Sequence, residues 1–352
     1  MRRNNNIFYL LFKKALYLAI TAAVLICLFI GYQFHHFQNL PISMTSESVT
    51  FSIKKGETIR QVSQNLKDAG FINDHLMFIV LAKLNGEETR IKAGEYRLKA
   101  QDTPQDLLNH FIKGSSVNYS FTIIEGWTYK QLTEAIMQDP ILEQTETLSD
   151  YKTVMSSISA QGSHPEGLFL PDTYHFPRGT SDIQFLKRAN ITLSEVLEKE
   201  WALRAENLPL KTPYEALILA SIIEKETGVT YEMPLISAAF IKRLQKNMRL
   251  QTDPTIIYGL GDKFDGNIRY RDLRKDTPYN TYIHKGLTPT PISLPGREAI
   301  HAALHPADSN AIFFVSKGDG THHFSETLDE HNAAVRKYQL KGRKPKRKAE
   351  SG

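Results

Sequence analysis

The sequence is poor in cysteine and lacks the short motifs that hold nucleotides or catalytic metals. Its one cysteine, Cys27, excludes an intramolecular disulfide. A Gly-rich phosphate loop with a lysine and a dinucleotide fingerprint are both missing. His322, His323 and His331 lack the His-Glu-x-x-His spacing of zinc enzymes, and Ser221 lies in Ala-Ser-Ile, outside any Gly-x-Ser-x-Gly elbow. We therefore expect no cofactor, no metal and no serine nucleophile.

The body of the chain also lacks an excess of positive charge. The whole chain carries a net charge of +5, but residues 341–352 alone carry +5, and four basic residues before position 15 add +4. Residues 15–340 therefore sum to −4. A mildly acidic body argues against a nucleic-acid partner, and residues 341–352 are interpreted as a disordered basic tail.

Residues 15–32 contain no charged side chain and predict a transmembrane anchor. As a helix they span about 27 Å, close to the hydrocarbon thickness of a bilayer. Residues 33–36 offer no small-x-small cleavage site, so an uncleaved anchor is favoured over a signal peptide. The basic residues before the anchor place residues 1–14 in the cytoplasm and the body in the periplasm, on the cytoplasmic (inner) membrane.

Beyond a linker at residues 33–49, the pattern predicts an α+β fold. Residues 50–100 read as strand, two helices and strand, a small βααβ unit that resembles the LysM-like subdomain of glycan-holding proteins. The alternative is a small packing module without a ligand. Gly-x-Thr-x-x-Gln at residues 56–61 recurs at 126–131 and predicts a second strand, turn and helix within residues 101–205. Residues 206–340 are expected to form a mixed α/β catalytic domain.

A buried central helix organises the expected catalytic domain. Thr212 is a suitable N-cap, Pro213 fits the first turn, and Gly228 suits a left-handed stop. Residues 216–223 are apolar except for one serine, so this helix should be buried nearly all round. It ends with Glu224 and Glu226, and burial would raise the pKa of either toward neutrality. Helical periodicity does not choose between them.

Several polar residues elsewhere are candidate sugar contacts. Glu166 lies in an aromatic, Pro/Gly-rich loop at residues 164–174 that can line a sugar site. Asp253 can cap the helix that Pro254 begins, whereas Gln251 and Thr252 have no evident structural task. The proline-rich residues 286–296 predict a stiff loop that forms a cleft wall.

These motifs together resemble the endolytic murein transglycosylase family, also called YceG-like. One departure lies in the loop at 286–292, where Thr288 and Thr290 stand in place of the usual proline and glycine. The resemblance rests on residues 125–128, 166–167, 171–174, 220–227, 250–255, 258–259 and 279–282, together with His322 and residues 331–332.

The resemblance implies cleavage of the β-1,4 bond between N-acetylmuramic acid and N-acetylglucosamine in peptidoglycan, without water and with formation of a 1,6-anhydro ring. It places the catalytic role on Glu224, which acts first as acid and then as base. It suggests peptidoglycan synthases as partners and the ending of glycan elongation as the role. The candidate substrate-binding residues are Gln251, Thr252, Asp253, Asn280, Tyr282 and Glu166.

Two alternatives remain open from the sequence. One is a non-catalytic scaffold that binds the cell wall through the LysM-like part. The other is a hydrolase of the muramidase type, in which Glu224 works with Asp253 or Asp172 as a second carboxylate. The distance between the two carboxylates decides whether such a hydrolase is possible, and the sequence does not give this distance.

Overall fold

The protein is described by a computed structural model for residues 2–44, 46–114, 117–145, 148, 150–158 and 164–340, with only the backbone for residues 2–11. It divides into two compact units. The first is Met1–Tyr119 with Phe176–Gly179, and the second is Ser120–His175 with Thr180–Gly352. The predicted basic tail, residues 341–352, lies outside the described residues.

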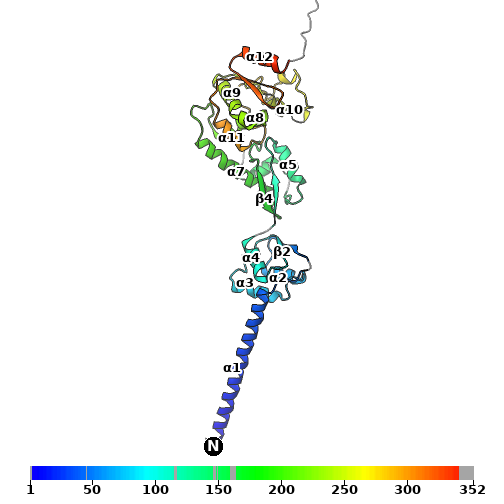
Figure 1. The fold of residues 1–352 in the computed structure, drawn as a ribbon, viewed down its shortest axis with the longest axis vertical. Helices are drawn as coiled ribbons and strands as arrows, with labels where there is room; N and C mark the ends of the chain where they lie inside the picture. Colours follow the sequence, from blue (N-terminus) through cyan, green and yellow to red (C-terminus); the bar gives the residue numbers. More distant parts are fainter. Residues whose placement is uncertain are drawn as a thin grey trace, which may run out of the picture. The chain divides into compact units, whose positions relative to one another are not determined.

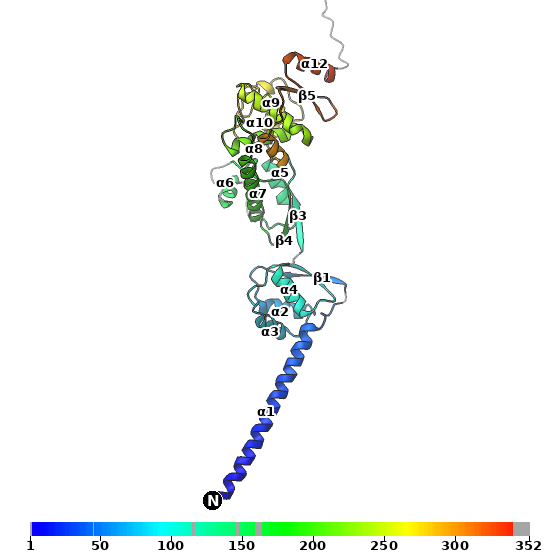
Figure 2. The ribbon, with the colours of Figure 1, turned by 60° about the vertical axis from the view of Figure 1, so that its left-hand side comes forward.

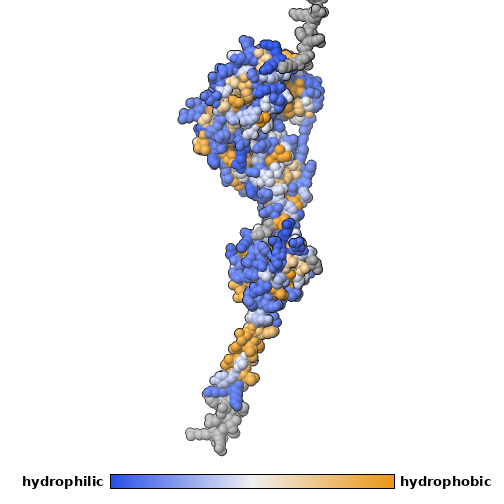
Figure 3. Space-filling model, viewed as in Figure 1, coloured by the Kyte–Doolittle hydropathy of each residue, from blue (hydrophilic) through white to orange (hydrophobic). Residues whose placement is uncertain are grey.

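The chain begins with one long helix, α1 (Arg2–Asn39). Its part Phe12–Asn39 is long and apolar enough to cross a membrane. Figure 3 shows the exposed hydrophobic band of this helix. The helix continues past the predicted anchor because residues 33–40 contain no proline or glycine, and the first proline is Pro41. Phe37 and Ile42 are buried in the core of the first unit, so the expected linker begins as packed structure.

Residues 48–99 of the first unit have the βααβ order that the sequence predicts, and a further helix, α4 (Pro104–Lys113), packs into the same core. Strands β1 and β2 pair antiparallel with Phe51 opposite Tyr96, and both aromatic side chains are buried. The likeness to LysM stays a prediction. The elements are β1 (Ser48–Ile53), α2 (Ile59–Asp68), α3 (His75–Leu84), β2 (Gly94–Lys99) and α4 (Pro104–Lys113).

The repeated Gly-x-Thr-x-x-Gln forms the same turn and cap in both places. Gly56 and Gly126 have φ of 86° and 74°, a conformation that favours glycine. Thr58 and Thr128 each start a helix with a complete capping box to the glutamine three residues later. The predicted cause of the repeat, a tight turn before a capped helix, is confirmed.

The second unit is built around α8 (Pro213–Glu226), which packs against α7, α9 and α11 (Figure 1). All eight residues 216–223 are buried, as the apolar sequence predicts. Its other helices and strands are α5 (Tyr129–Gln138), α6 (Tyr151–Ser157), β4 (Thr173–Pro177), α7 (Asp182–Ala202), α9 (Met233–Gln245), α10 (Asp253–Leu260), α11 (Arg297–Leu304), β5 (Phe313–Ser316), β6 (His322–Ser325) and α12 (Leu328–Tyr338), with short 3-10 turns at Thr230–Glu232, Gly261–Lys263 and Asp272–Arg274.

Strand β3 (Asn118–Thr122) pairs with β4, and β5 pairs with β6 in an antiparallel hairpin. Helix α12 contacts both hairpin strands, and Figure 2 shows it beside β5. His322 and His323, which lack the spacing of a zinc motif, lie just after the turn of this hairpin. They belong to β6 because the turn itself is made by residues 317–321, where Gly318 and Gly320 have positive φ.

One expectation about the end of α8 is wrong. Gly228 does not stop the helix in a left-handed conformation, since Thr227 already leaves it with extended φ of −148° and ψ of 140°. The Thr227 hydroxyl accepts a hydrogen bond from the backbone N–H of Val229 at 3.0 Å, which stabilises this extended exit. The last turn of α8 therefore includes both Glu224 and Glu226, and each of these side chains contacts a different loop of the same unit.

Candidate active site

Ser221 fixes a loop onto the buried face of α8. Its side chain is fully buried, accepts a hydrogen bond from Ile292 N at 3.0 Å and donates to Ile218 O at 2.7 Å. Ser293 Oγ donates to Ser221 O at 3.2 Å. With its hydroxyl committed to backbone groups inside the core, Ser221 is a structural residue, in agreement with the absence of a nucleophile elbow.

Glu224 is half-buried in the last turn of α8. It contacts Gly296, which follows Ile292 and Ser293 in the same loop. Its Oε2 accepts a hydrogen bond from the backbone N–H of Gly296 at 2.9 Å. Burial raises the pKa of Glu224 to about 7; the Gly296 hydrogen bond opposes this rise, and the charge of Glu125 adds to it. Glu224 therefore has the protonation behaviour that a general acid needs near neutral pH.

Gly296 and Gly126 let this part of the site close tightly. A Cβ atom on Gly296 would overlap with the Glu125 carboxylate. Gly126 N donates to Leu294 O at 2.9 Å, and Lys225 Nζ donates to Gly126 O at 3.1 Å. The loop that carries Glu125 and the loop that ends at Gly296 thus bracket Glu224.

Glu226 points to a different side of α8. Two positions along an α-helix correspond to a rotation of about 200°, so Glu224 and Glu226 face nearly opposite directions. Glu226 Oε1 accepts a hydrogen bond from the Thr252 hydroxyl. Burial raises the pKa of Glu226, and the nearby charge of Asp253 raises it further, against the hydrogen bond from Thr252.

Glu226 lies in a cavity of about 470 Å³ with four of the predicted substrate-binding residues. This volume suits a sugar-sized ligand, since small-molecule sites start near 300 Å³. The polar part of the lining is Glu226, Arg243, Gln251, Thr252, Asp253, Tyr282, Ser316, His322, His331 and Gln339, and Phe313 and Phe314 supply aromatic surface. The structure therefore brings these predicted residues together around Glu226 and does not place Glu224 in the lining.

Asp253 does not cap α10, contrary to expectation. The N-cap position is occupied by Thr252, without a side-chain cap, and α10 begins at Asp253. Asp253 Oδ1 instead accepts a hydrogen bond from the Tyr282 hydroxyl at 2.6 Å. Gln251 has φ of 52°, and its N–H donates to Thr281 O at 3.1 Å, which leaves its exposed side chain beside this pair.

Asn280 and Glu166 are placed differently from the cavity residues. Asn280 is fully buried; its Nδ2 donates to Lys275 O at 2.7 Å and its Oδ1 accepts from Tyr282 N at 2.9 Å. Glu166 is 3% exposed, and its two carboxylate oxygens accept from Tyr129 N at 2.9 Å and Tyr258 Oη at 3.0 Å. Both geometries favour positioning of loops over direct contact with sugar.

Two residues that were not predicted from the sequence, Arg243 and Glu232, also shape the cavity. Arg243 on α9 lies with its guanidinium 5.5 Å from the centre of the Phe313 ring, and its Nε donates to Ile312 O at 2.7 Å. Glu232 is 2% exposed and holds His322, with Glu232 Oε2 2.8 Å from His322 Nδ1. Neither has a local sequence signal, because each acts through a contact with a distant segment.

Thr288 and Thr290, which depart from the family pattern, form local hydrogen bonds. Thr288 Oγ1 donates to Thr290 O at 2.8 Å, and Thr290 Oγ1 lies 2.9 Å from the hydroxyl of Tyr279. The two threonine hydroxyls thus have partners within the same loop region, and the proline-rich wall stays ordered without the usual proline and glycine.

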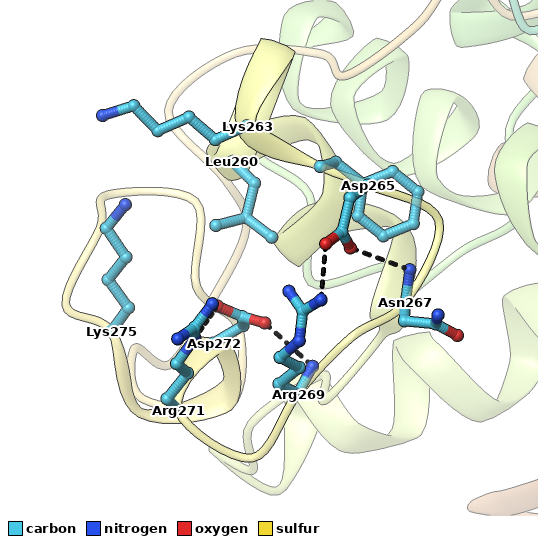
Figure 4. Close-up of a pocket in the computed structure, with 9 residues that line it drawn as sticks. Leu260, Lys263, Asp265, Asn267, Arg269, Arg271, Asp272 and Lys275 are labelled. Atoms are coloured by element: carbon cyan, nitrogen blue, oxygen red, sulfur yellow. Dashed lines mark hydrogen bonds and ion pairs between the residues drawn. The ribbon is translucent and has the colours of Figure 1, made fainter.

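A second cavity, of about 460 Å³, lies along residues 260–275. Figure 4 shows the Arg269 guanidinium directed at the Asp265 carboxylate, and Arg271 lies 3.8 Å from Asp272. None of the predicted site residues lines this cavity. Its arginines are already paired with aspartates, so we assign the candidate active site to the cavity at Glu226.

The chain is similar in sequence to known proteins over most of its length. The chain is 29% identical over 318 residues to an endolytic murein transglycosylase of Bacillus subtilis (strain 168), covering 85% of this chain and 87% of that protein. It is 28% identical over 343 residues to an endolytic murein transglycosylase of Streptococcus pneumoniae serotype 2, covering 87% of this chain and 61% of that protein.

A crystal structure of a yceG-like protein from Listeria monocytogenes is also similar, with 31% identity, a TM-score of 0.49, and coverage of 82% of this chain and 99% of that one. A family model described as the YceG-like family matches residues 51–337. Because this family match spans most of the chain and includes α8 and the cavity lining apart from Gln339, the chain belongs to the YceG-like family.

Proposed function

We propose that this chain is an endolytic murein transglycosylase, a lyase that cleaves peptidoglycan glycan strands between N-acetylmuramic acid and N-acetylglucosamine. Family membership and the names of the relatives support the activity. The observation that carries it is the polar cavity at the end of α8, in which the half-buried carboxyl of Glu226, whose pKa is raised, lies with hydroxyl, amide and carboxylate side chains. Such groups can bind the hydroxyls of a sugar and protonate a glycosidic oxygen.

A single glutamate is sufficient for the proposed chemistry. In its protonated form it gives its proton to the glycosidic oxygen as the bond to C1 of the muramic acid breaks. As a carboxylate it then takes the proton of the muramic C6 hydroxyl, whose oxygen forms the new bond to C1 and closes the 1,6-anhydro ring. The nucleophile belongs to the substrate, so the reaction has the advantage of an intramolecular step and needs no water.

The geometry favours Glu226 as this glutamate, because Glu226 shares the cavity with Gln251, Thr252, Asp253 and Tyr282. Glu224 is the residue that the family resemblance selects, and its pKa near 7 keeps it a candidate. Glu226→Gln and Glu224→Gln should be compared in the same cleavage assay, with thermal melting as a control for folding. We expect Glu226→Gln to lower the rate about 10²–10⁴-fold and Glu224→Gln to lower it much less. The reverse ranking would return the catalytic role to Glu224.

The reaction type is tested by digestion of purified peptidoglycan in ¹⁸O-water, followed by mass spectrometry of the products. A lyase leaves 1,6-anhydro-N-acetylmuramic acid ends without the label, whereas hydrolysis adds one labelled oxygen at each cut. The hydrolase is a real competitor because Asp253 lies in the same cavity as Glu226 and is not occupied as a helix cap. Labelled muramic acid ends would contradict the lyase. Binding without any cleavage by the full chain would instead support the scaffold alternative.

The proposal includes location and partners. α1 would anchor the chain in the cytoplasmic membrane with residues 1–14 inside and both units in the periplasm, where glycan strands are made. The βααβ unit would hold the glycan strand as a LysM-like module. Nearby peptidoglycan synthases are the partners that such a location implies, and cutting nascent strands would end their elongation.

A further inference from the structure

Three side chains with metal-binding atoms meet at the ends of α7 and α11. Glu200 lies in the last turn of α7, His301 lies in the last turn of α11, and His305 follows that helix directly. His301 Nδ1 is 2.8 Å from Glu200 Oε2, and His305 Nε2 is 3.5 Å from the same oxygen. One ligand atom from each residue lies within 4.8 Å of the other two. This group is separate from the residues that line the cavity at Glu226.

The two histidines share one face of the helix. They are four positions apart, and their rings stack with centroids 4.3 Å apart and planes 25° from parallel. His305 N donates to His301 O at 2.8 Å, so His305 directly follows the last turn of α11, although its own backbone, with φ of −132° and ψ of 66°, has left the helix. A pair of histidines at this spacing presents two nitrogen atoms in one direction, as zinc sites on helices do.

The acid comes from a segment that is fixed to the same place. Ala205 N, just after α7, donates to Leu304 O at 2.9 Å. This backbone hydrogen bond holds the end of α7 against the end of α11. The three ligands are thus carried by two packed helices rather than by a loose loop, which keeps their separation small before any ion binds.

Glu200 is directed at the histidines and not at another cation. Within the described part of the chain, its ion pairs are with His301 and His305 only. Arg204, four residues further on, lies over the Trp201 ring at 4.2 Å and donates to Trp201 O at 2.8 Å. The side chains of Glu200 and His301 are 20% and 52% exposed, so an ion and a water ligand can reach them from solvent.

We propose that Glu200, His301 and His305 form a binding site for a divalent transition-metal ion of the zinc type, with water as the remaining ligand. Two imidazole nitrogens and one carboxylate oxygen are a ligand set that zinc, cobalt and nickel accept. Ligand atoms bound tetrahedrally at about 2.1 Å lie about 3.4 Å apart. The two measured distances to Glu200, 2.8 and 3.5 Å, bracket that value.

The site would act as a structural link between α7 and α11. Helix α11 starts directly after Gly296, whose N–H donates to Glu224, so the ion would fix the far end of the helix that closes the last turn of α8. No catalytic step passes through the ion. The proposal is independent of the reaction assigned to the cavity.

The test uses the full-length chain in detergent, stripped with EDTA and then titrated with Zn²⁺ or Co²⁺. We expect wild-type protein to bind one more equivalent of metal than Glu200→Gln or the double variant His301→Gln/His305→Gln, and cobalt to give visible absorption bands that both variants lose. Wild-type melting temperature should rise by about 3 °C or more at a metal concentration of roughly ten times the dissociation constant, and Mg²⁺ should not replace zinc.

His284→Gln is the matched control. His284 forms an exposed pair with Asp276 at 2.7 Å but has no second histidine beside it, so this variant should keep the full metal stoichiometry and the full melting shift. Circular dichroism and metal-free melting show whether each variant folds. Equal stoichiometry in wild type and both ligand variants, or binding lost only in His284→Gln, would overturn the site and leave an ordinary ion pair of Glu200 with the histidines. EDTA that leaves the melting of zinc-treated wild-type protein unchanged would overturn it as well.

Discussion

The hydroxyl of Tyr282 donates to Asp253 Oδ1 at 2.6 Å, and this bond directs the carboxylate of Asp253 into the cavity that holds Glu226. As a result the cavity contains two carboxylates, and the charge of Asp253 raises the pKa of Glu226. On the other side of α8, Glu125 raises the pKa of Glu224 in the same way. Each candidate acid therefore has its own neighbouring charge.

This pairing predicts how the pH dependence of cleavage responds to mutation. A general acid works in its protonated form, so activity is lost as pH rises through its pKa. Removing a neighbouring negative charge lowers the pKa of a carboxyl, which moves the loss of activity to lower pH. We expect Asp253→Asn to shift the alkaline limb of kcat/KM downward by roughly one unit and Glu125→Gln to leave it in place.

The position of the limb is read independently of the overall rate, so a partial loss of activity in Asp253→Asn does not obscure it. Asparagine can still accept the Tyr282 hydroxyl, which preserves the local structure. A shift in Glu125→Gln with none in Asp253→Asn would identify Glu224 as the acid.

Ser221→Ala should lower stability without removing activity from the folded fraction. The change leaves the buried N–H of Ile292 without its acceptor, which costs about 1–3 kcal/mol. The control is Ser194→Ala, since Ser194 Oγ donates to Asn190 O at 3.1 Å on an exposed face of α7, and we expect a change within about 0.5 kcal/mol. Chemical denaturation measures both. Complete loss of activity in stable, folded Ser221→Ala would contradict the structural role.

Gly167→Ala should destabilise the protein more than Gly286→Ala. Both glycines have positive φ, 81° and 86°, so alanine pays backbone strain of about 1 kcal/mol at either position. At Gly167 the new methyl would also overlap the ring of Pro291, whereas at Gly286 it would meet open space. We expect a loss of about 2–4 kcal/mol for Gly167→Ala. Equal losses in denaturant titrations would show that the loop at Pro291 yields easily.

The membrane anchor predicts where a C-terminal reporter works. A reporter fused after Gly352 should be active only if it functions in the periplasm, and the chain should sediment with membranes until detergent is added. The basic residues before the apolar helix are the reason that we expect this orientation. A fusion active in the cytoplasm, or a mature N-terminus near residue 33, would contradict an uncleaved anchor.

Local sequence signals predicted the elements well. Thr212 starts α8 as expected, and the repeated Gly-x-Thr-x-x-Gln forms the turn and helix that it predicts. These features depend on neighbouring residues, so a short window of sequence contains their cause. The apolar run of α8 likewise predicted its burial.

The arrangement of the site could not be predicted in the same way. Which glutamate of α8 faces the cavity depends on contacts with Thr252, Phe313 and other residues far along the chain. Asp253 has a plausible local role as a cap but meets Tyr282 instead. The expectation of no metal rested on one spacing motif, whereas the proposed site takes its acid from another helix.

The last turn of α8, which ends at the extended Thr227, is held on two sides by hydrogen bonds, from Gly296 to Glu224 and from Thr252 to Glu226. Two hydrogen bonds on opposite sides of the helix resist rotation of this turn about the helix axis. The orientation of the Glu224 carboxylate therefore depends partly on the hydrogen bond of Glu226, and the reverse also holds. Loss of either hydrogen bond should make the orientation of both glutamate side chains less well defined. A substitution that removes one of these bonds can therefore impair proton transfer without contacting the substrate.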